Sequence, residues 1–182
     1  MTTLLAIDPG NTASGWALID VATRRPIEFG KTPNGDLRRR IDTYAGMPGA
    51  LTADRVVIEM VACYGMPVGA EVFETCVWIG RFYEGYASGH GVTPELVKRQ
   101  PVKLHHCHSA KAKDSNVRQA LVDRFAPGQP NHGKGTKAVP GWFYGFHADV
   151  WQAYALAVYA ADVQAAAAHH TARTTHTKEQ DQ

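Results

Sequence analysis

The sequence predicts an α/β domain, with a mixed sheet whose first three strands are antiparallel, whose later strands are parallel, and whose sides carry helices. Two apolar runs, residues 4–7 and 56–58, have the length and branching of strands buried on both faces. Each run ends in a carboxylate, Asp8 or Glu59. Amphipathic segments of helical period follow the strands. Because the runs end alike, we expect both acids at one edge of the sheet.

Composition is that of an ordinary globular domain, with 182 residues, 45% hydrophobic and 20% charged. Three cysteines, without a secretory leader before the first strand, indicate free thiols and a cytoplasmic location. The Ala-rich residues 153–168 include Asp162 and Gln164, so we expect a packed helix and no membrane span. We expect one domain over residues 1–168 and a polar, disordered tail over residues 169–182.

The first half of the chain is predicted to form four strands and two helices. Pro9-Gly10 turns the chain after the first strand, so the second strand pairs with it antiparallel. The expected strands cover residues 4–8, 15–19, 26–31 and 55–59, and the expected helices cover residues 36–44 and 71–87.

The helix expected over residues 71–87 is apolar around more of its circumference than one sheet can cover. A helix packed on a single sheet needs an apolar stripe of roughly 100°. The surplus therefore predicts either a homodimer contact or further burial within the domain. The apolar side chains are Val72, Phe73, Cys76, Ile79, Phe82, Tyr83 and Tyr86.

The second half is predicted to hold two more helices separated by a long loop. Residues 115–125 form a short amphipathic helix, with Asp114 or Ser115 as its N-cap. The loop over residues 126–146 contains five glycines, three prolines and four aromatic residues. These aromatics either stack on unpaired bases or pack back onto the core. A long Ala-rich helix then opens at Asp149.

This order of elements matches a ribonuclease H-like layout, and three segments resemble RuvC-like Holliday junction resolvases, especially their phage-borne branch. The segments are residues 4–10 with 14–16, residues 57–59 with Gly80-Arg81, and residues 147–149 with 153–157. The resemblance implies a homodimeric endonuclease that cuts four-way DNA junctions by metal-assisted hydrolysis, leaving 5′-phosphate and 3′-hydroxyl ends.

A carboxylate at the end of a buried strand is costly unless a cation or a substrate offsets its charge. Oxygen ligands of this kind favour Mg²⁺ or Mn²⁺. The resemblance implies two ions per subunit, with Asp8 bridging both, Glu59 holding one and Asp149 the other. Taken singly, each acid also has a purely structural alternative. Asp8 could simply begin the turn, and Asp149 could simply complement the helix dipole.

One position departs from the resolvase pattern. Bacterial members have a further Asp three positions after the first Asp of the last helix, where this chain has Gln152. A neutral amide can orient a water but supplies no charge, and His147 or Glu71 could compensate. The alternative for His147 is a structural position before the helix.

Basic residues are concentrated between the second and third acidic segments, where residues 98–118 contain six of them against one acid. Clustered cations of this kind bind a phosphate backbone. The resemblance implies that Lys111 or Lys113 contacts the scissile phosphate. The predicted DNA-binding residues are Lys98, Arg99, Lys103, Lys111, Lys113, Arg118, Lys134 and Lys137.

The run from His105 to His108 contains three histidines and Cys107, which are potential zinc ligands. In an extended segment, His105 and Cys107 would face one side while His106 and His108 would face the other. That split argues against a structural zinc site.

Two competing functions remain at this stage, and a third is excluded by the length of the chain. A branched-DNA-binding protein with a weakened site would explain Gln152. Another nuclease of the ribonuclease H-like fold would use the same three acids on a different substrate. Actin-like ATPases also begin with an Asp-x-Gly turn, but they need two lobes, for which 182 residues are too few.

Overall fold

The computed structural model describes residues 1–63, 65 and 67–179, with side chains as far as Ala168. Its sheet has the strand order β3-β2-β1-β4-β5. β2 pairs antiparallel with β1 and β3, whereas β4 pairs parallel with β1 and β5. This arrangement confirms the predicted ribonuclease H-like mixed sheet. The strands are β1 (Thr3–Asp8), β2 (Ala13–Asp20), β3 (Pro26–Pro33), β4 (Arg55–Met60) and β5 (Glu95–Lys98).

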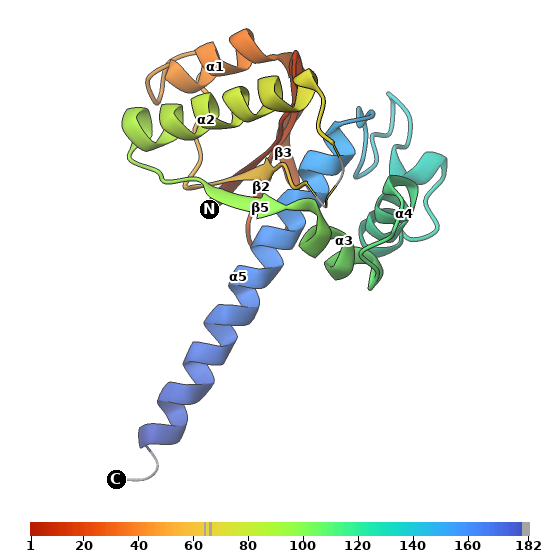
Figure 1. Ribbon diagram of the computed structural model, residues 1–182. Coiled ribbons are helices and arrows are strands. Elements are labelled where there is room, and N and C mark those ends of the chain that lie inside the picture. Colours follow the sequence, from red (N-terminus) through yellow and green to blue (C-terminus); the bar gives the residue numbers. More distant parts are fainter. Residues whose placement is uncertain (64, 66, 180–182) are drawn as a thin grey trace.

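Helices cover both faces of the sheet. α1 and α2 lie over one face, α5 crosses the other, and α3 and α4 flank α5 (Figure 1). The last part of α5 extends away from the body of the molecule (Figure 1). The helices are α1 (Asn34–Asp42), α2 (Ala70–His90), α3 (Arg99–Cys107), α4 (Asp114–Phe125) and α5 (Val150–Glu179), with a 3₁₀ turn, η1 (Asn131–Gly133).

The alternation of side chains along β1 divides the core into two layers. Leu5 and Ile7 pack among the α1 and α2 side chains, while Leu4 and Ala6 pack against α5. All four are fully buried. Since successive side chains of a strand point to opposite faces, Asp8 lies on the α5 face. The end of β1 thus directs its carboxylate toward the start of α5.

The wide apolar arc of α2 is only partly used within the chain. Ile79, Phe82 and Tyr86 are buried against the sheet, and the Tyr86 hydroxyl donates a 2.8 Å hydrogen bond to the Leu51 carbonyl. By contrast, Phe73 and Val77 are 63% and 54% exposed. Further burial within the described chain therefore does not account for the surplus apolar surface.

β5 and α3 were not predicted from the sequence, and the extended conformation considered for residues 105–108 was wrong. His105 and His106 lie in α3 and both contact α5. His105 Nε2 lies 2.8 Å from a carboxylate oxygen of Asp162, and His106 Nε2 donates to the Ala155 carbonyl at 2.9 Å. Burial lowers the pKa of His106 to about 4, so the ring is neutral when it donates. These histidines hold α3 on α5.

The long loop packs back onto the core, as one of the two interpretations of its aromatics predicted. Phe143 and Phe146 are buried. Trp142 stacks on Phe125 with ring centroids 5.1 Å apart and donates to the Tyr154 hydroxyl at 3.0 Å. Tyr144 remains 40% exposed. Most of the aromatic surface of the loop is therefore structural.

α5 runs to Glu179, beyond the boundary predicted for the folded domain at residue 168. The predicted domain boundary itself stays a prediction, and residues 180–182 lie outside the described residues. Within the described part of the chain, no helix has the length and apolar character required to cross a membrane.

Asp162 joins three elements to α5. Its carboxylate accepts hydrogen bonds from Arg24, which follows β2, and from Arg124 of α4, and it contacts His105 of α3. Only 14% of the Asp162 side chain is exposed. Although burial opposes ionisation, the hydrogen bonds from Arg124 and His105 hold the pKa of Asp162 below its usual range. A carboxyl whose pKa is lower in the folded protein than in the unfolded chain stabilises the native state. This stabilisation is fully present at pH values above the pKa of the unfolded chain and is lost as the pH falls below it.

Replacing Asp162 by Asn should lower the free energy of unfolding by about 1–3 kcal/mol at pH 7, because Arg24, Arg124 and His105 lose a mostly buried anionic partner. The difference from the unmodified protein should shrink as the pH falls below about 4, where the unfolded carboxylate becomes protonated. Urea unfolding at several pH values measures both effects. Asp42→Asn, which removes an exposed i,i+4 pair with Arg38, is the matched control and should change stability by less than about 0.5 kcal/mol. An Asp162→Asn protein as stable as this control would contradict the role assigned to the cluster.

Candidate active site

The strand register brings Asp8 and Glu59 together. Ile7 of β1 pairs with Ile58 of β4 in parallel register, so the next residues, Asp8 and Glu59, end neighbouring strands at the same edge. Val57 packs against α5, and Glu59, two residues later, therefore points to the same face as Asp8. The apolar runs that form these strands thus position both acids.

Asp149 reaches the same place because Gly15 has no side chain. Gly15 pairs with Asp8 across β1 and β2, on the face that α5 covers. A Cβ built on Gly15 would lie 2.6 Å from the Asp149 carbonyl oxygen and 2.9 Å from the Asp149 Cβ. The chain before α5 therefore rests directly on the Gly15 backbone, beside Asp8.

The pKa of Asp8 reflects the other acids around it. Loss of hydration, together with the charges of Glu59 and Asp149, raises the pKa of Asp8 to about 8, although Arg99 opposes the shift. In the part of the chain that the structure describes, no group donates a hydrogen bond to the Asp8 carboxylate. A half-buried acid without a donor, beside two other acids, is a group that a cation would stabilise.

Glu59 is held by Arg99, which the sequence analysis had placed among the DNA contacts. Arg99 donates one hydrogen bond to Glu59 and another to Asp114, both at 2.8 Å. The Glu59 side chain is only 15% exposed, and burial raises its pKa although Arg99 opposes that shift. Asp114, expected as an N-cap, is instead the first residue of α4 and follows Lys113 at the cap position. The Arg99 guanidinium group thus connects β4 to the start of α4.

Lys31 is a site residue that the sequence analysis missed. It lies on β3 opposite Gly15, and its Nζ forms a 2.5 Å salt bridge with a carboxylate oxygen of Asp149. The predicted third strand ended at this residue, so counting the register across β1, β2 and β3 would have placed it beside the acids. Its pairing partner, Gly15, leaves room for this contact.

The donor set suits a hard divalent cation, because three carboxylates supply oxygen ligands of the kind that Mg²⁺ and Mn²⁺ prefer. Their arrangement is not that of a preformed metal centre. Among the described residues, no group of three or more His, Cys, Asp or Glu side chains is close enough to hold a metal ion. Lys31 and Arg99 each occupy one oxygen of an outer acid. Asp8, Glu59 and Asp149 would hold a metal by moving toward it.

Gln152 and His147 lie near Asp149 but differ in their surroundings. Gln152 lines a pocket of about 220 Å³ between α4 and α5, with Arg118, Asp114 and Trp151. His147 is exposed, and its backbone carbonyl accepts a hydrogen bond from Val150 at the start of α5. That position is the structural alternative considered for His147, and a catalytic role for either residue stays a prediction.

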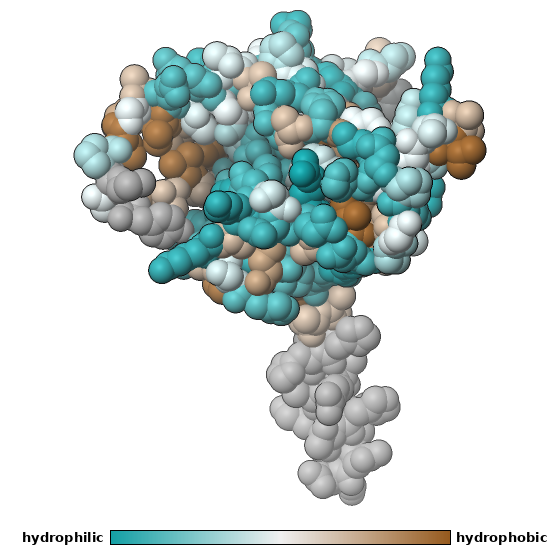
Figure 2. All heavy atoms as spheres, turned by 90° about the vertical axis from the view of Figure 1, so that its right-hand side faces the viewer, coloured by the Kyte–Doolittle hydropathy of each residue, from teal (hydrophilic) through white to brown (hydrophobic). Residues whose placement is uncertain are grey.

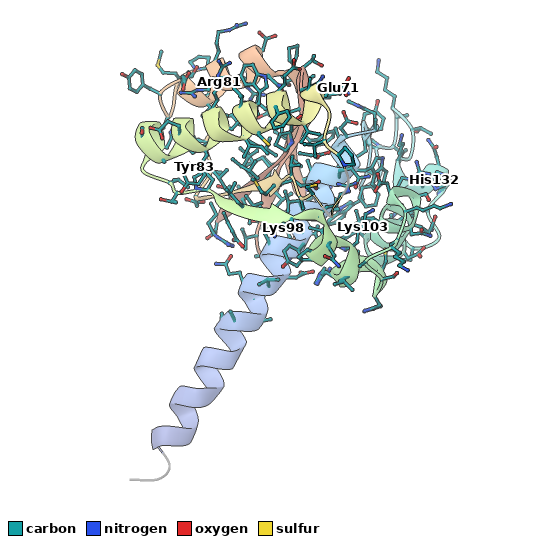
Figure 3. All side chains as sticks on the ribbon, in the orientation of Figure 1. Glu71, Arg81, Tyr83, Lys98, Lys103 and His132 are labelled. Carbon is teal, nitrogen blue, oxygen red and sulfur yellow. The ribbon has the colours of Figure 1, made fainter. Side chains whose placement is uncertain are left out.

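A larger pocket of about 680 Å³ opens beside Glu59, and Arg99, Lys103 and Lys111 contribute to its lining. Lys98 ends β5, and Lys103 lies in α3 (Figure 3). The face that carries α3, α4 and the long loop is mostly hydrophilic (Figure 2). Its exposed basic residues include Lys98, Lys111, Lys113, Arg118 and Lys137, while Lys103 and Lys134 are half-buried.

The fold resembles that of solved RuvC structures. A structure of RuvC from Thermus thermophilus aligns with a TM-score of 0.63 and 16% identity, covering 91% of this chain and 97% of that chain. T. thermophilus RuvC in complex with a Holliday junction substrate aligns with a TM-score of 0.60 and 15% identity, covering 87% and 92%. No family model and no curated protein matches the sequence. At these identities the likeness establishes the fold.

Gly15→Ala should displace the start of α5, because the added methyl group overlaps the backbone of Asp149. We expect the free energy of unfolding to fall by about 1–3 kcal/mol, as in other overpacked sites. Gly35→Ala is the matched control, since a Cβ on this helical glycine meets nothing within 4 Å. That variant should be neutral or more stable by up to about 1 kcal/mol. Equal stabilities of the two variants in urea would contradict the close contact between Gly15 and Asp149.

Proposed function

We propose that this protein is an endonuclease that depends on Mg²⁺ or Mn²⁺ and cuts branched DNA, with four-way junctions as its substrate. The observation that carries the proposal is the half-buried Asp8 carboxylate, which has no hydrogen-bond donor in the described part of the chain and lies beside Glu59 and Asp149. Two further observations support it. The surrounding fold resembles RuvC, and one of the similar structures holds a Holliday junction substrate.

The proposed reaction is hydrolysis of a phosphodiester. A water oxygen bonds to phosphorus, the bond from phosphorus to the 3′ oxygen breaks, and the leaving oxygen takes up a proton. When bound, a divalent cation lowers the pKa of water and stabilises the developing negative charge. Asp8, Glu59 and Asp149 would hold it, and the sequence motifs predict two ions. Gln152 and His147 are proposed to orient water, since both lie close to Asp149 along the chain.

The DNA backbone is proposed to cross the hydrophilic face. Lys103 and Lys111 line the pocket beside Glu59, and Arg118 lines the pocket beside Gln152, so basic residues flank the acids on two sides. Lys111 or Lys113 is the proposed contact to the scissile phosphate. Lys98, Lys134 and Lys137 extend the proposed surface, whereas Arg99 contributes through Glu59 and Asp114.

A branched-DNA-binding protein with a weakened site is the second candidate. Gln152 in place of a carboxylate and the salt bridges on Glu59 and Asp149 favour it. Another nuclease of the same fold would prefer hybrids or linear ends. Membership of the phage-borne branch and a cytoplasmic location rest on the sequence alone and stay predictions.

In a nicking assay on a mobile four-way junction with Mg²⁺ or Mn²⁺, the unmodified protein should cut and the Asp8→Asn variant should bind without cutting. We expect a loss of at least about 100-fold, because that variant removes a charge from the proposed metal ligands. Asp36→Asn, an exposed acid on α1, is the matched control and should cut normally. Binding without cleavage by the unmodified protein would favour the second candidate.

Binding to the same junction should weaken steeply with salt, if the basic residues contact phosphates. Six such contacts would lower the affinity by about 10³-fold between 50 and 200 mM salt. An affinity that does not change with salt would contradict the proposed surface.

A homodimer is proposed through the exposed apolar stripe of α2. Phe73, Cys76, Val77 and Gly80 are exposed and recur at i, i+3, i+4 and i+7, the spacing of one helix face. A Cβ on Gly80 would meet nothing within 4 Å, so the helix surface there is open to close approach. Glu71, Arg81 and Tyr83 lie on the same helix (Figure 3). A two-fold dimer would present two sites to a four-way junction.

Phe73→Asp should convert the dimer to a monomer, because it places a charge in the apolar stripe. Light scattering after size-exclusion chromatography measures the mass, and circular dichroism checks that the fold is retained. Val139→Asp changes an equally exposed apolar residue, 73% exposed on the long loop, and should leave the dimer intact. A monomeric unmodified protein at micromolar concentration would refute the dimer without affecting the metal assignment.

A further inference from the structure

Lys31 occupies a position set by three strands in register. Asp8, Gly15 and Lys31 lie side by side on β1, β2 and β3. Since the side chain is missing at the middle position, the Asp149 backbone rests on Gly15, between the two charged residues. The Lys31 ammonium group is therefore aimed at the acid cluster from the edge opposite Arg99.

The charges of the cluster are nearly balanced by the chain itself. When ionised, Asp8, Glu59 and Asp149 carry three negative charges, against two positive charges on Lys31 and Arg99. Two divalent ions would leave this set strongly positive, whereas one ion reverses a net charge of minus one to plus one. Gln152 adds no charge where a fourth carboxylate would assist a second ion.

The two outer acids are not held equally. Glu59 is bound by Arg99 through one oxygen, and the parallel register of β1 and β4 places it beside Asp8. The 680 Å³ pocket that Glu59 lines also contains Arg99, Lys103 and Lys111, so it suits a phosphate better than a cation. Asp149 is bound by Lys31 at 2.5 Å, and both side chains are partly exposed, at 36% and 44%. Lys31 has three N–H donors, so those not used by Asp149 can contact a phosphate of the DNA.

We propose that the Lys31 ammonium group takes the place of one divalent ion, so that the site binds a single Mg²⁺ or Mn²⁺ between Asp8 and Glu59. The inference rests on the proposed function, because it assigns the charges of the same site. Lys31 then neutralises Asp149 and acts as a positioning residue for it. The two ions implied by the sequence motifs are the competing outcome.

Counting Mn²⁺ bound to the full-length protein tests the proposal without reference to cleavage. Electron paramagnetic resonance detects free Mn²⁺, so a titration gives the number of ions bound per chain at saturation. We expect one ion for the unmodified protein and for Lys31→Arg, which keeps the charge. Lys31→Met should bind two, because Asp149 becomes available. Arg39→Met, which removes a surface cation paired with Asp36 on α1, is the matched control and should bind one.

Two ions on the unmodified protein, or one ion on a folded Lys31→Met variant, would overturn the role of Lys31. Circular dichroism establishes that this variant is folded. Failure of the proposed function looks different, because the unmodified protein would then not cut four-way junctions whatever its ion count. No bound Mn²⁺ on any variant would overturn both proposals.

Discussion

Mutual repulsion among three carboxylates at one edge of the sheet is the interaction on which the rest of the site depends. Asp8 is the most affected, since it is half-buried, has no hydrogen-bond donor in the described part of the chain, and lies near Glu59 and Asp149. A fold tolerates such a group when the carboxyl takes up a proton or when nearby cations offset its charge. Arg99 does so for Glu59, and Lys31 does so for Asp149. The two basic residues thus allow the acids to converge in the absence of a metal.

The sheet register determines which acids can converge. Parallel pairing of β1 with β4 places Asp8 and Glu59 at the same edge, and antiparallel pairing of β1 with β2 places Gly15 beside Asp8. The start of α5 can then approach the sheet because Gly15 leaves the space open. Further along α5, Asp162 binds Arg24, Arg124 and His105, which keeps the helix in place against α3, α4 and the turn after β2. Packing far from the acids therefore supports their geometry.

Much of the fold could be predicted because its signals are local. The apolar runs of β1 and β4, the Pro9-Gly10 turn and the amphipathic period of α2 each lie within a short window of sequence. β5 and α3 could not be found this way, since β5 has four residues and α3 contains Pro101 in its first turn, with three consecutive residues, His105, His106 and Cys107, that have low helix propensity. Contacts of His105 and His106 with α5, which no local window contains, hold α3 in place.

The candidate site also contains residues with local sequence signals and residues whose roles depend on long-range contacts. Asp8, Glu59 and Asp149 could be proposed because each ends an apolar strand or opens a helix, and the structure brings their charges together. Lys31 and the role of Arg99 depend on register and on an unpredicted helix, so composition alone assigned Arg99 to DNA. The two internal cations also give a physical reason for Gln152 at a position where bacterial resolvases have a carboxylate. A site that carries its own cations needs fewer negative charges, since each added carboxylate would increase a repulsion that Lys31 and Arg99 already have to offset.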